Sequence, residues 1–156
     1  MSEPGILRSL GARDLDRAAA LHASAFAALG ERAWTRQDVA ELLAAPGVAG
    51  LLIEDDDGDI GFALYRVASD ESELLTLAVS PVRRRRGAGR TLLSAVIERA
   101  RAAGARTLFL EVGTDNGPAQ SLYEAAGFAH VAKRPAYYQR HGGAVADALV
   151  MRLTLN

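Results

Sequence analysis

The stretch from residue 73 to residue 97 constrains the fold more than any other part of the chain. An apolar run ends just before Pro81, four consecutive arginines occupy positions 83–86, and apolar residues recur at helical spacing after Gly87 and Gly89. A strand pattern thus gives way to a basic turn and then to a helix. Any fold of this chain must bring a strand end, a cluster of arginines and a helix start together at one point.

The arginines stand where a helix on its own does not favour them. A helix start carries roughly half a positive charge from its unpaired N–H groups, so the basic run at 83–86 and Arg90 should repel it. A bound anion reverses that argument, because free amides, two glycines without side chains and guanidinium groups together suit a phosphate. The alternative is a solvated basic loop. Gly87 and Gly89 at the helix start favour phosphate binding.

The familiar nucleotide-binding loops do not match this turn. A Walker loop needs glycine where Arg84 stands and lysine where Arg90 stands, and a dinucleotide fingerprint needs a third glycine where Leu92 stands. If the turn binds a phosphate compound, it therefore does so with neither of these two nucleotide-binding motifs.

The charge distribution also narrows the choice of ligand. From residue 83 to residue 106 there are eight arginines and one acid, Glu98, so this stretch carries +7 and the rest −8, for a net charge of −1. A basic patch in an otherwise acidic chain suits a small polyanion better than general nucleic-acid binding. We expect no nucleic-acid partner.

Length and composition predict a cytoplasmic protein of one domain. The 156 residues fit one hydrophobic core, so residues 1–156 are expected to form a single domain. No apolar run approaches the length that crosses a bilayer, and no signal peptide is visible after Met1. The sequence has no cysteine, which excludes disulfides and thiolate chemistry. We expect neither a membrane partner nor a bound metal, since the acidic run at 54–59 reads as a solvated hairpin tip that lacks the pattern of a calcium loop.

The periodicity of apolar residues predicts an α/β fold. Asp14 and Thr35 are candidate caps for the first two helices, and Gly30 is expected to end the first. A mixed sheet of about seven strands with about four helices on its two faces is the implied architecture. The expected strands are 6–10, 48–53, 60–66, 71–79, 107–112, 128–134 and 148–155, and the expected helices are 14–29, 35–43, 87–104 and 118–127.

The basic turn resembles the acyl-coenzyme A signature of the GNAT family of N-acetyltransferases. That signature is Gln/Arg-x-x-Gly-x-Gly/Ala, and this chain has Arg84, Arg85, Arg86, Gly87, Ala88 and Gly89. The resemblance is closest to the RimI branch, which acetylates the N-terminal amine of a small-subunit ribosomal protein. It continues through Leu77–Pro81, Leu110–Val112, Asp115–Asn116, Leu122–Phe128, Tyr137–Tyr138 and Asp147–Met151.

The resemblance implies acetyl-coenzyme A as co-substrate and a fold whose strands splay to admit it. The amides of Arg85 to Arg90 would hold its pyrophosphate and Asn116 its pantetheine arm, although Asn116 can also cap a helix next to Pro118. Backbone N–H groups around Leu77, Ala78 and Val79 would orient the acetyl carbonyl. We expect the sheet to lose its pairing near Ser80 and Pro81.

The same resemblance assigns catalytic roles to Glu111 and Tyr123. In isolation Glu111 is a carboxylate at the end of an apolar strand, a position that is usually at the surface, and Tyr123 fits a plain core role on its helix. In RimI-like enzymes the matching residues act as general base and general acid. Tyrosine keeps its proton at neutral pH and can therefore protonate a departing thiolate.

Three aromatic residues are candidates for binding the acceptor amine. Trp34 reads either as a hydrophobic staple next to the Thr35 cap or as a wall of the substrate groove. Tyr137 and Tyr138, together with the loop from Gln139 to Ala146, match the region that clasps the peptide N-terminus in the RimI branch, or else form an exposed aromatic hairpin. His22 lies on the apolar stripe of the first helix and reads as a packed residue.

The expected function is direct acetyl transfer to a protein N-terminus, without a covalent enzyme intermediate. A free α-amine, with a pKa near 8, costs about 3 kcal/mol less to deprotonate than lysine. Two departures bear on the acceptor: Gly113 stands where RimI relatives often have arginine, and Val145–Ala146 replaces a frequent Arg-Glu pair. The alternatives are acetylation of a small amine, and a coenzyme A sensor without catalysis, against which the presence of both Glu111 and Tyr123 argues.

Overall fold

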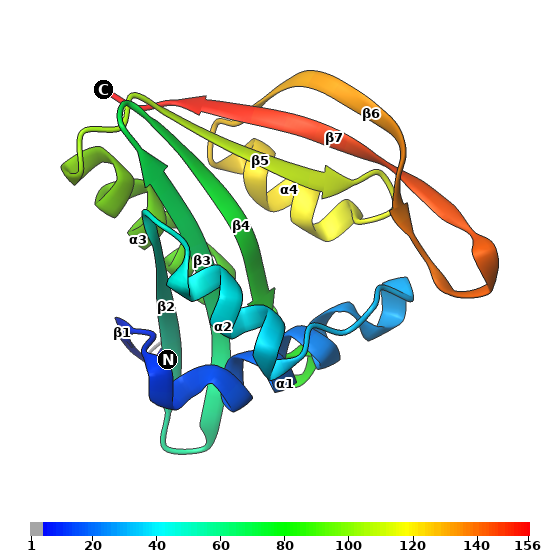
Figure 1. Cartoon of the computed structure of the whole chain (residues 1–156), viewed down its shortest axis with the longest axis horizontal. Coiled ribbons are helices and arrows are strands. Elements are labelled where there is room, and N and C mark those ends of the chain that lie inside the picture. The colour runs from blue at the N-terminus through cyan, green and yellow to red at the C-terminus, as the bar shows by residue number, and fades with distance from the viewer. Residues whose placement is uncertain (1–4) are drawn as a thin grey trace.

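The computed structural model describes residues 5–156, and all seven of its strands join in one sheet. The strands follow the order β1-β2-β3-β4-β5-β7-β6 (Figure 1). Neighbours are antiparallel except β4 and β5, which are parallel. The strands are β1 Ile6–Ser9, β2 Val48–Asp55, β3 Gly58–Ala68, β4 Glu71–Val79, β5 Thr107–Gly113, β6 Ala129–Gln139 and β7 Val145–Thr154.

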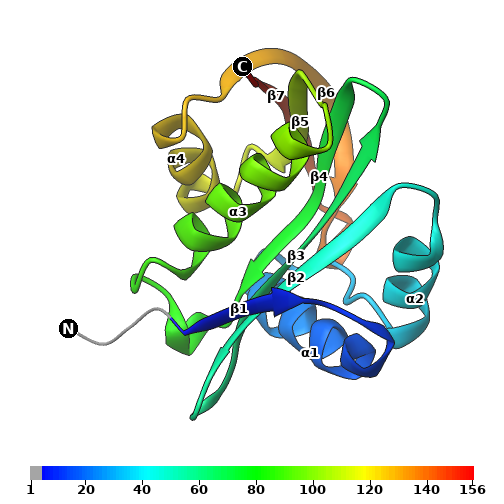
Figure 2. The same ribbon diagram turned by 90° about the vertical axis from the view of Figure 1, so that its left-hand side faces the viewer.

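Four α-helices cover the two faces of the sheet, as the sequence predicted. They are α1 Leu15–Phe26, α2 Arg36–Ala44, α3 Ala88–Ala102 and α4 Gly117–Ala125. Figure 2 shows α3 and α4 on one face and α1 and α2 on the other. Each face has its own apolar core, because the side chains of a strand alternate between the two sides. The core under α3 and α4 extends across both halves of the sheet, whereas the core under α1 and α2 contains residues of β2, β3 and β4 and none from β5, β6 or β7.

The pairing between β4 and β5 is short. It consists of four residue pairs, from Glu71↔Thr107 to Leu74↔Leu110. Beyond Leu74, β4 continues to pair with β3 as far as Val79, while β5 continues to pair with β7 as far as Gly113. The two strands therefore diverge from a shared end (Figure 1). The expected loss of pairing at Ser80 and Pro81 was wrong in position, because β4 separates from β5 while both strands are still regular.

Other boundaries differ from the prediction by a few residues. The first helix ends at Phe26 and continues as a 3-10 turn, Ala27–Leu29, before Gly30 with a left-handed φ of 69°. The last two strands are longer at their shared hairpin than predicted. Thr35 caps α2 by accepting a hydrogen bond from the Asp38 N–H at 3.1 Å.

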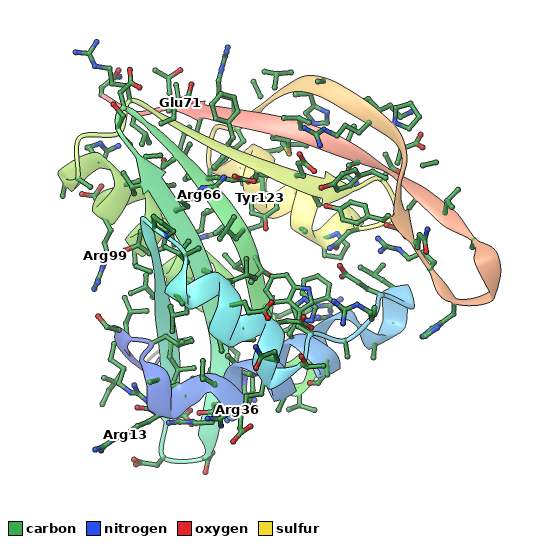
Figure 3. The ribbon with its side chains drawn as sticks, viewed as in Figure 1. Arg13, Arg36, Arg66, Glu71, Arg99 and Tyr123 are labelled. Atoms are coloured by element: carbon green, nitrogen blue, oxygen red, sulfur yellow. The ribbon has the colours of Figure 1, made fainter. Side chains whose placement is uncertain are left out.

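Asp14 does not cap α1 as expected. Its carboxylate accepts hydrogen bonds from the Gly11 N–H at 2.8 Å and from Arg8 and Arg17. These arginines lower the pKa of this buried carboxyl to about 2, chiefly through the hydrogen bonds of Arg8. Asp14 thus fastens β1 to the start of α1, since Arg8 lies on β1. Figure 3 shows how the charged side chains of Arg13 and Arg99 project from the periphery, while Tyr123 lies inside the molecule.

Candidate active site

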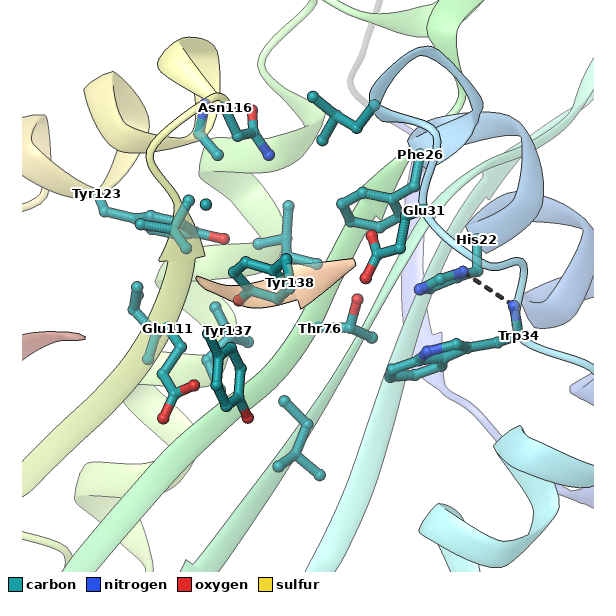
Figure 4. A pocket seen from close by; sticks show the side chains of 18 of the residues that line it. His22, Phe26, Glu31, Trp34, Thr76, Glu111, Asn116, Tyr123, Tyr137 and Tyr138 are labelled. Carbon is teal, nitrogen blue, oxygen red and sulfur yellow. Dashed lines mark hydrogen bonds between the residues drawn. The ribbon is translucent and has the colours of Figure 1, made fainter. Parts of the chain in front are cut away.

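A pocket of about 320 Å³ lies where β4 and β5 separate. Its walls come from both strands and from the helices of both faces, so it reaches through the opening in the sheet. Figure 4 shows the side chains around it. The lining residues include Leu74 to Leu77 of β4, Leu110 to Gly113 of β5, Asn116, Ala119 and Tyr123 beside or on α4, Tyr138 of β6, and Phe26 and Trp34 on the opposite wall.

Glu111 lies in this pocket near the end of β5. Alternation along β5 buries Leu108, Leu110 and Val112 and leaves Glu111 partly open, with its side chain 20% exposed. The Glu111 carboxylate oxygen lies 3.3 Å from a guanidinium nitrogen of Arg134 on β6. A carboxylate with one exposed ionic partner retains lone pairs for a substrate amine.

Tyr123 reaches the same pocket from α4. It is 6% exposed, and its ring packs edge-on against Phe128 with centroids 5.8 Å apart. Burial raises the pKa of Tyr123 well above its ordinary value. Its hydroxyl points into the pocket (Figure 4) and makes no hydrogen bond within residues 5–156. A protonated hydroxyl in this position can donate a hydrogen bond to a ligand while the ring of Tyr123 packs in the core.

The start of α3 has the features of an anion site. Gly87 caps the helix with φ of 84°, a left-handed conformation, and the first turn contains no acidic residue. In the described chain, the amides from Arg84 to Arg90 donate no backbone hydrogen bond. Free amides at a positive helix end, with arginines around them, fit a pyrophosphate. The residues present therefore suit the phosphate group of coenzyme A.

The four consecutive arginines divide into two pairs. Arg83 forms an ion pair with Asp55, and Arg84 donates to the Ala25 carbonyl at 2.7 Å and the Val79 carbonyl at 3.3 Å. These two side chains brace the turn against β2, β4 and α1. Arg85 and Arg86 are exposed and make no ion pair within the described chain. The same is true of Arg90, one turn later: it is exposed and has no ion-pair partner there.

The anion site adjoins the pocket through α4 and β4. A Cβ placed on Gly89 would lie 3.4 Å from Leu122 and 3.9 Å from Leu77. Leu77 lines the pocket, whereas the buried side chain of Ala78 packs on the opposite face with α1 and α2. Beyond Leu74, alternate residues of β4 direct their N–H groups toward β5 but have no strand partner there. Leu77, Ala78 and Val79 lie in this region, so free N–H donors are available for an acyl carbonyl. Asn116 lines the pocket and also caps α4, accepting from the Ala119 N–H at 3.3 Å.

Trp34 and His22 form part of the opposite wall. Their rings stack with centroids 4.2 Å apart, and His22 Nδ1 accepts a hydrogen bond from the Trp34 N–H at 3.3 Å (Figure 4). His22 is 1% exposed, and burial lowers its pKa to about 4. His22 is thus a packed residue, as the sequence predicted. Trp34 lines the pocket and also packs against the core beside α2.

Tyr137 and Tyr138 lie on β6 at the other side of the opening. Their rings meet edge-on at 5.0 Å, and Tyr138 lies between Glu111 and Glu31 (Figure 4). Burial, followed by the charge of Glu111, raises the pKa of both tyrosines. Both hydroxyls remain donors at neutral pH.

Two charged residues that line the pocket, Glu31 and Arg140, were not singled out individually from the sequence. Glu31 follows α1 and lines the pocket, where burial raises its pKa. Arg140 also lines the pocket and is bound to Asp115, which lies in the loop after β5. Asp115 was noticed as part of a motif, but Glu31 and Arg140 stand in turns of irregular pattern, so no periodicity points to them.

None of the helices within residues 5–156 is long and apolar enough to cross a membrane. The same part of the chain contains no group of three or more histidine and acidic side chains that could hold a metal ion.

Comparison with known proteins identifies the family. Residues 15–128 match the model of the acetyltransferase (GNAT) family. A ribosomal protein bS18-alanine N-acetyltransferase of Salmonella typhimurium is 39% identical over 106 residues, covering 68% of this chain and 71% of that protein. The crystal structure of the ribosomal-protein-S18-alanine N-acetyltransferase from Escherichia coli has a TM-score of 0.87 at 30% identity, covering 97% of this chain and 94% of that one. A phosphinothricin acetyltransferase of Sinorhizobium meliloti, in complex with acetyl-CoA, has the same fold, with a TM-score of 0.83 at 22% identity and coverage of 99% and 90%.

The open sheet, the anion site at α3 and the pocket between the strands define an acyl-transfer enzyme. More narrowly, the chain belongs to the GNAT family of acetyltransferases. It is an N-acetyltransferase with acetyl-CoA as co-substrate.

Proposed function

We propose that this protein transfers an acetyl group directly to the α-amine of a protein N-terminus, with the N-terminal alanine of ribosomal protein bS18 as acceptor. The observation that carries the proposal is that Glu111 and Tyr123, from β5 and α4, line one pocket where β4 and β5 separate. The named activity of the Salmonella typhimurium and Escherichia coli relatives supports this acceptor. A ribosomal acceptor also places the reaction in the cytoplasm.

The chain's own residues supply binding and proton transfer. Bound acetyl-CoA supplies an activated thioester. The amides from Arg85 to Arg90 hold the phosphate end, and Asn116 lies beside the path from there to the pocket. Glu111 takes a proton from the acceptor amine, directly or through a water, and Tyr123 gives its proton to the sulfur that leaves. Free N–H groups of β4 around Leu77 to Val79 stabilise negative charge on the acyl oxygen.

A second candidate is a small cationic amine, because three glutamates line the pocket. Glu31, Glu73 and Glu111 would attract a polyamine or an aminoglycoside. The pocket also has Tyr137, Tyr138 and Trp34 along its walls, an apolar and hydrogen-bonding lining that suits a peptide as well.

One assay separates these candidates. The enzyme and acetyl-CoA are mixed with a peptide carrying the bS18 N-terminus, with the same peptide blocked at its α-amine, and with a panel of small amines, while free thiol is measured. We expect thiol release with the free peptide and a loss of at least about 100-fold in Glu111→Gln. Release with small amines alone would replace the acceptor, and release with none would contradict catalysis.

A further inference from the structure

Arg140 is fixed in the pocket wall with one donor left over. It lies just after β6, and its side chain is only 8% exposed. Its Nε and Nη2 donate to the two carboxylate oxygens of Asp115 at 2.9 and 3.0 Å, and its guanidinium carbon lies 4.8 Å from the ring centroid of Tyr138. The remaining nitrogen, Nη1, is buried and has no hydrogen-bond partner within residues 5–156. A buried donor without an acceptor is unfavourable, and in a ligand pocket it points to an acceptor atom on the ligand.

Gly113 makes room for this arrangement. A Cβ at position 113 would lie 2.5 Å from a carboxylate oxygen of Asp115 and 2.9 Å from Nη2 of Arg140. The pair therefore lies directly against the end of β5, and any side chain at position 113 would displace it. The Asp115–Arg140 pair therefore requires a residue without a side chain at position 113.

The position of the guanidinium relative to Glu111 suggests what the spare donor binds. Glu111 and Gly113 point to the same face of β5, since they are two residues apart, and their positions are separated by roughly 7 Å along the strand. The amine and the carbonyl oxygen of one acceptor residue are close enough together to be bound by two groups on this face of β5.

The charges around Arg140 favour a neutral oxygen. Asp115 already balances the charge of Arg140, and two further carboxyl groups, those of Glu31 and the Arg134-paired Glu111, line the same pocket. The free carboxylate of an amino acid would be repelled there, whereas the carbonyl of a peptide would not.

We propose that Arg140 is a substrate-binding residue whose Nη1 donates to the carbonyl oxygen of the acceptor's first residue, next to the amine that Glu111 deprotonates. The inference rests on the proposed function and deepens it. It makes the enzyme selective for amines that carry an adjacent peptide carbonyl.

The test compares acceptors that differ in this carbonyl. Initial rates at saturating acetyl-CoA are measured for a peptide beginning with alanine, for the same peptide with its first carbonyl oxygen replaced by sulfur, for L-alanine, and for isopropylamine, which lacks the carbonyl. The enzymes are the wild type, Arg140→Gln, Gly113→Ala and the control Arg152→Gln, an exposed arginine of β7. Gly113→Ala retains Arg140 but places a Cβ against it.

We expect Arg140→Gln and Gly113→Ala to lower kcat/KM by about 10- to 100-fold with the alanine peptide and by no more than about twofold with isopropylamine. The wild type should prefer the oxygen peptide to the sulfur peptide and to L-alanine. Equal losses of kcat/KM with the peptide and with isopropylamine would show that Arg140 has only a structural role. If the wild type acetylates the oxygen and sulfur peptides equally well, the inference is overturned even if no variant folds. A wild type that acetylates isopropylamine or L-alanine better than the peptide overturns it too, and one that acetylates nothing refutes the proposed function itself.

Discussion

Leu74 of β4 and Leu110 of β5 form the last residue pair between these two strands, and both side chains line the pocket. The next residues on β4 are free of β5, and the next residue on β5 is Glu111. The point at which the sheet opens therefore also fixes the position of the proposed base.

Replacing Tyr123 by phenylalanine should slow turnover without weakening coenzyme binding. The ring packing against Phe128 is retained, while the proton donor is lost. We expect kcat to fall by about 100-fold or more and the dissociation constant of acetyl-CoA to change little. Steady-state kinetics and calorimetry measure the two quantities. A large loss of affinity with normal turnover would contradict the role given to this hydroxyl.

Removing the exposed arginines at the start of α3 should weaken coenzyme binding. In the double variant Arg86→Ala, Arg90→Ala we expect the dissociation constant of acetyl-CoA to rise about tenfold or more, and more so at low ionic strength. Arg101→Ala serves as the matched control, because Arg101 lies at the other end of the same helix and pairs with Glu98. Equal effects of the two sets of changes would argue against a phosphate site at the helix start.

A large side chain at position 89 should abolish coenzyme binding. A Cβ at Gly89 makes an ordinary contact with Leu122 at 3.4 Å, but a longer side chain has to enter the space between α3, α4 and β4. We therefore expect Gly89→Leu to lose calorimetric binding of acetyl-CoA and Gly89→Ala to keep most of it. Unchanged binding in Gly89→Leu would place the coenzyme elsewhere.

His22 should make the protein less stable as the pH falls from about 6.5 to about 4. The pKa of His22 is lowered to about 4 in the folded chain, against 6.5 ordinarily, by burial. In this window the unfolded chain binds the proton that the folded chain refuses, so protonation favours unfolding. The thermal midpoint of His22→Gln should fall less steeply across that range than that of the wild type. Parallel curves would show that His22 does not contribute.

The sequence was sufficient to predict the helices and strands but not the point at which β4 and β5 separate. Period-two and period-3.6 patterns placed every strand and α-helix within a few residues, because each buries one face. The opening of the sheet was placed at Pro81 because proline visibly interrupts a strand, whereas the actual separation at Leu74 is set by the different partners that β4 and β5 keep.

Most of the predicted residues that line the pocket came from a family motif, and Trp34 is the exception. Glu111, Tyr123 and Tyr138 came from such motifs and share the pocket. Glu31 and Arg140 lie in turns, and the reason they matter is contact between segments far apart in the chain, which no local pattern records. The same holds for Arg84, whose side chain reaches the Ala25 carbonyl rather than solvent.

The apolar core beneath α1 and α2 stops at β4, while the core beneath α3 and α4 continues across the opening. The half of the sheet formed by β5, β7 and β6 therefore has no helical cover on the side away from the coenzyme site. A bulky acceptor can approach from that side while the coenzyme occupies the other, so the two reactants can enter from opposite faces of the sheet. We therefore expect both reactants to bind before either product leaves.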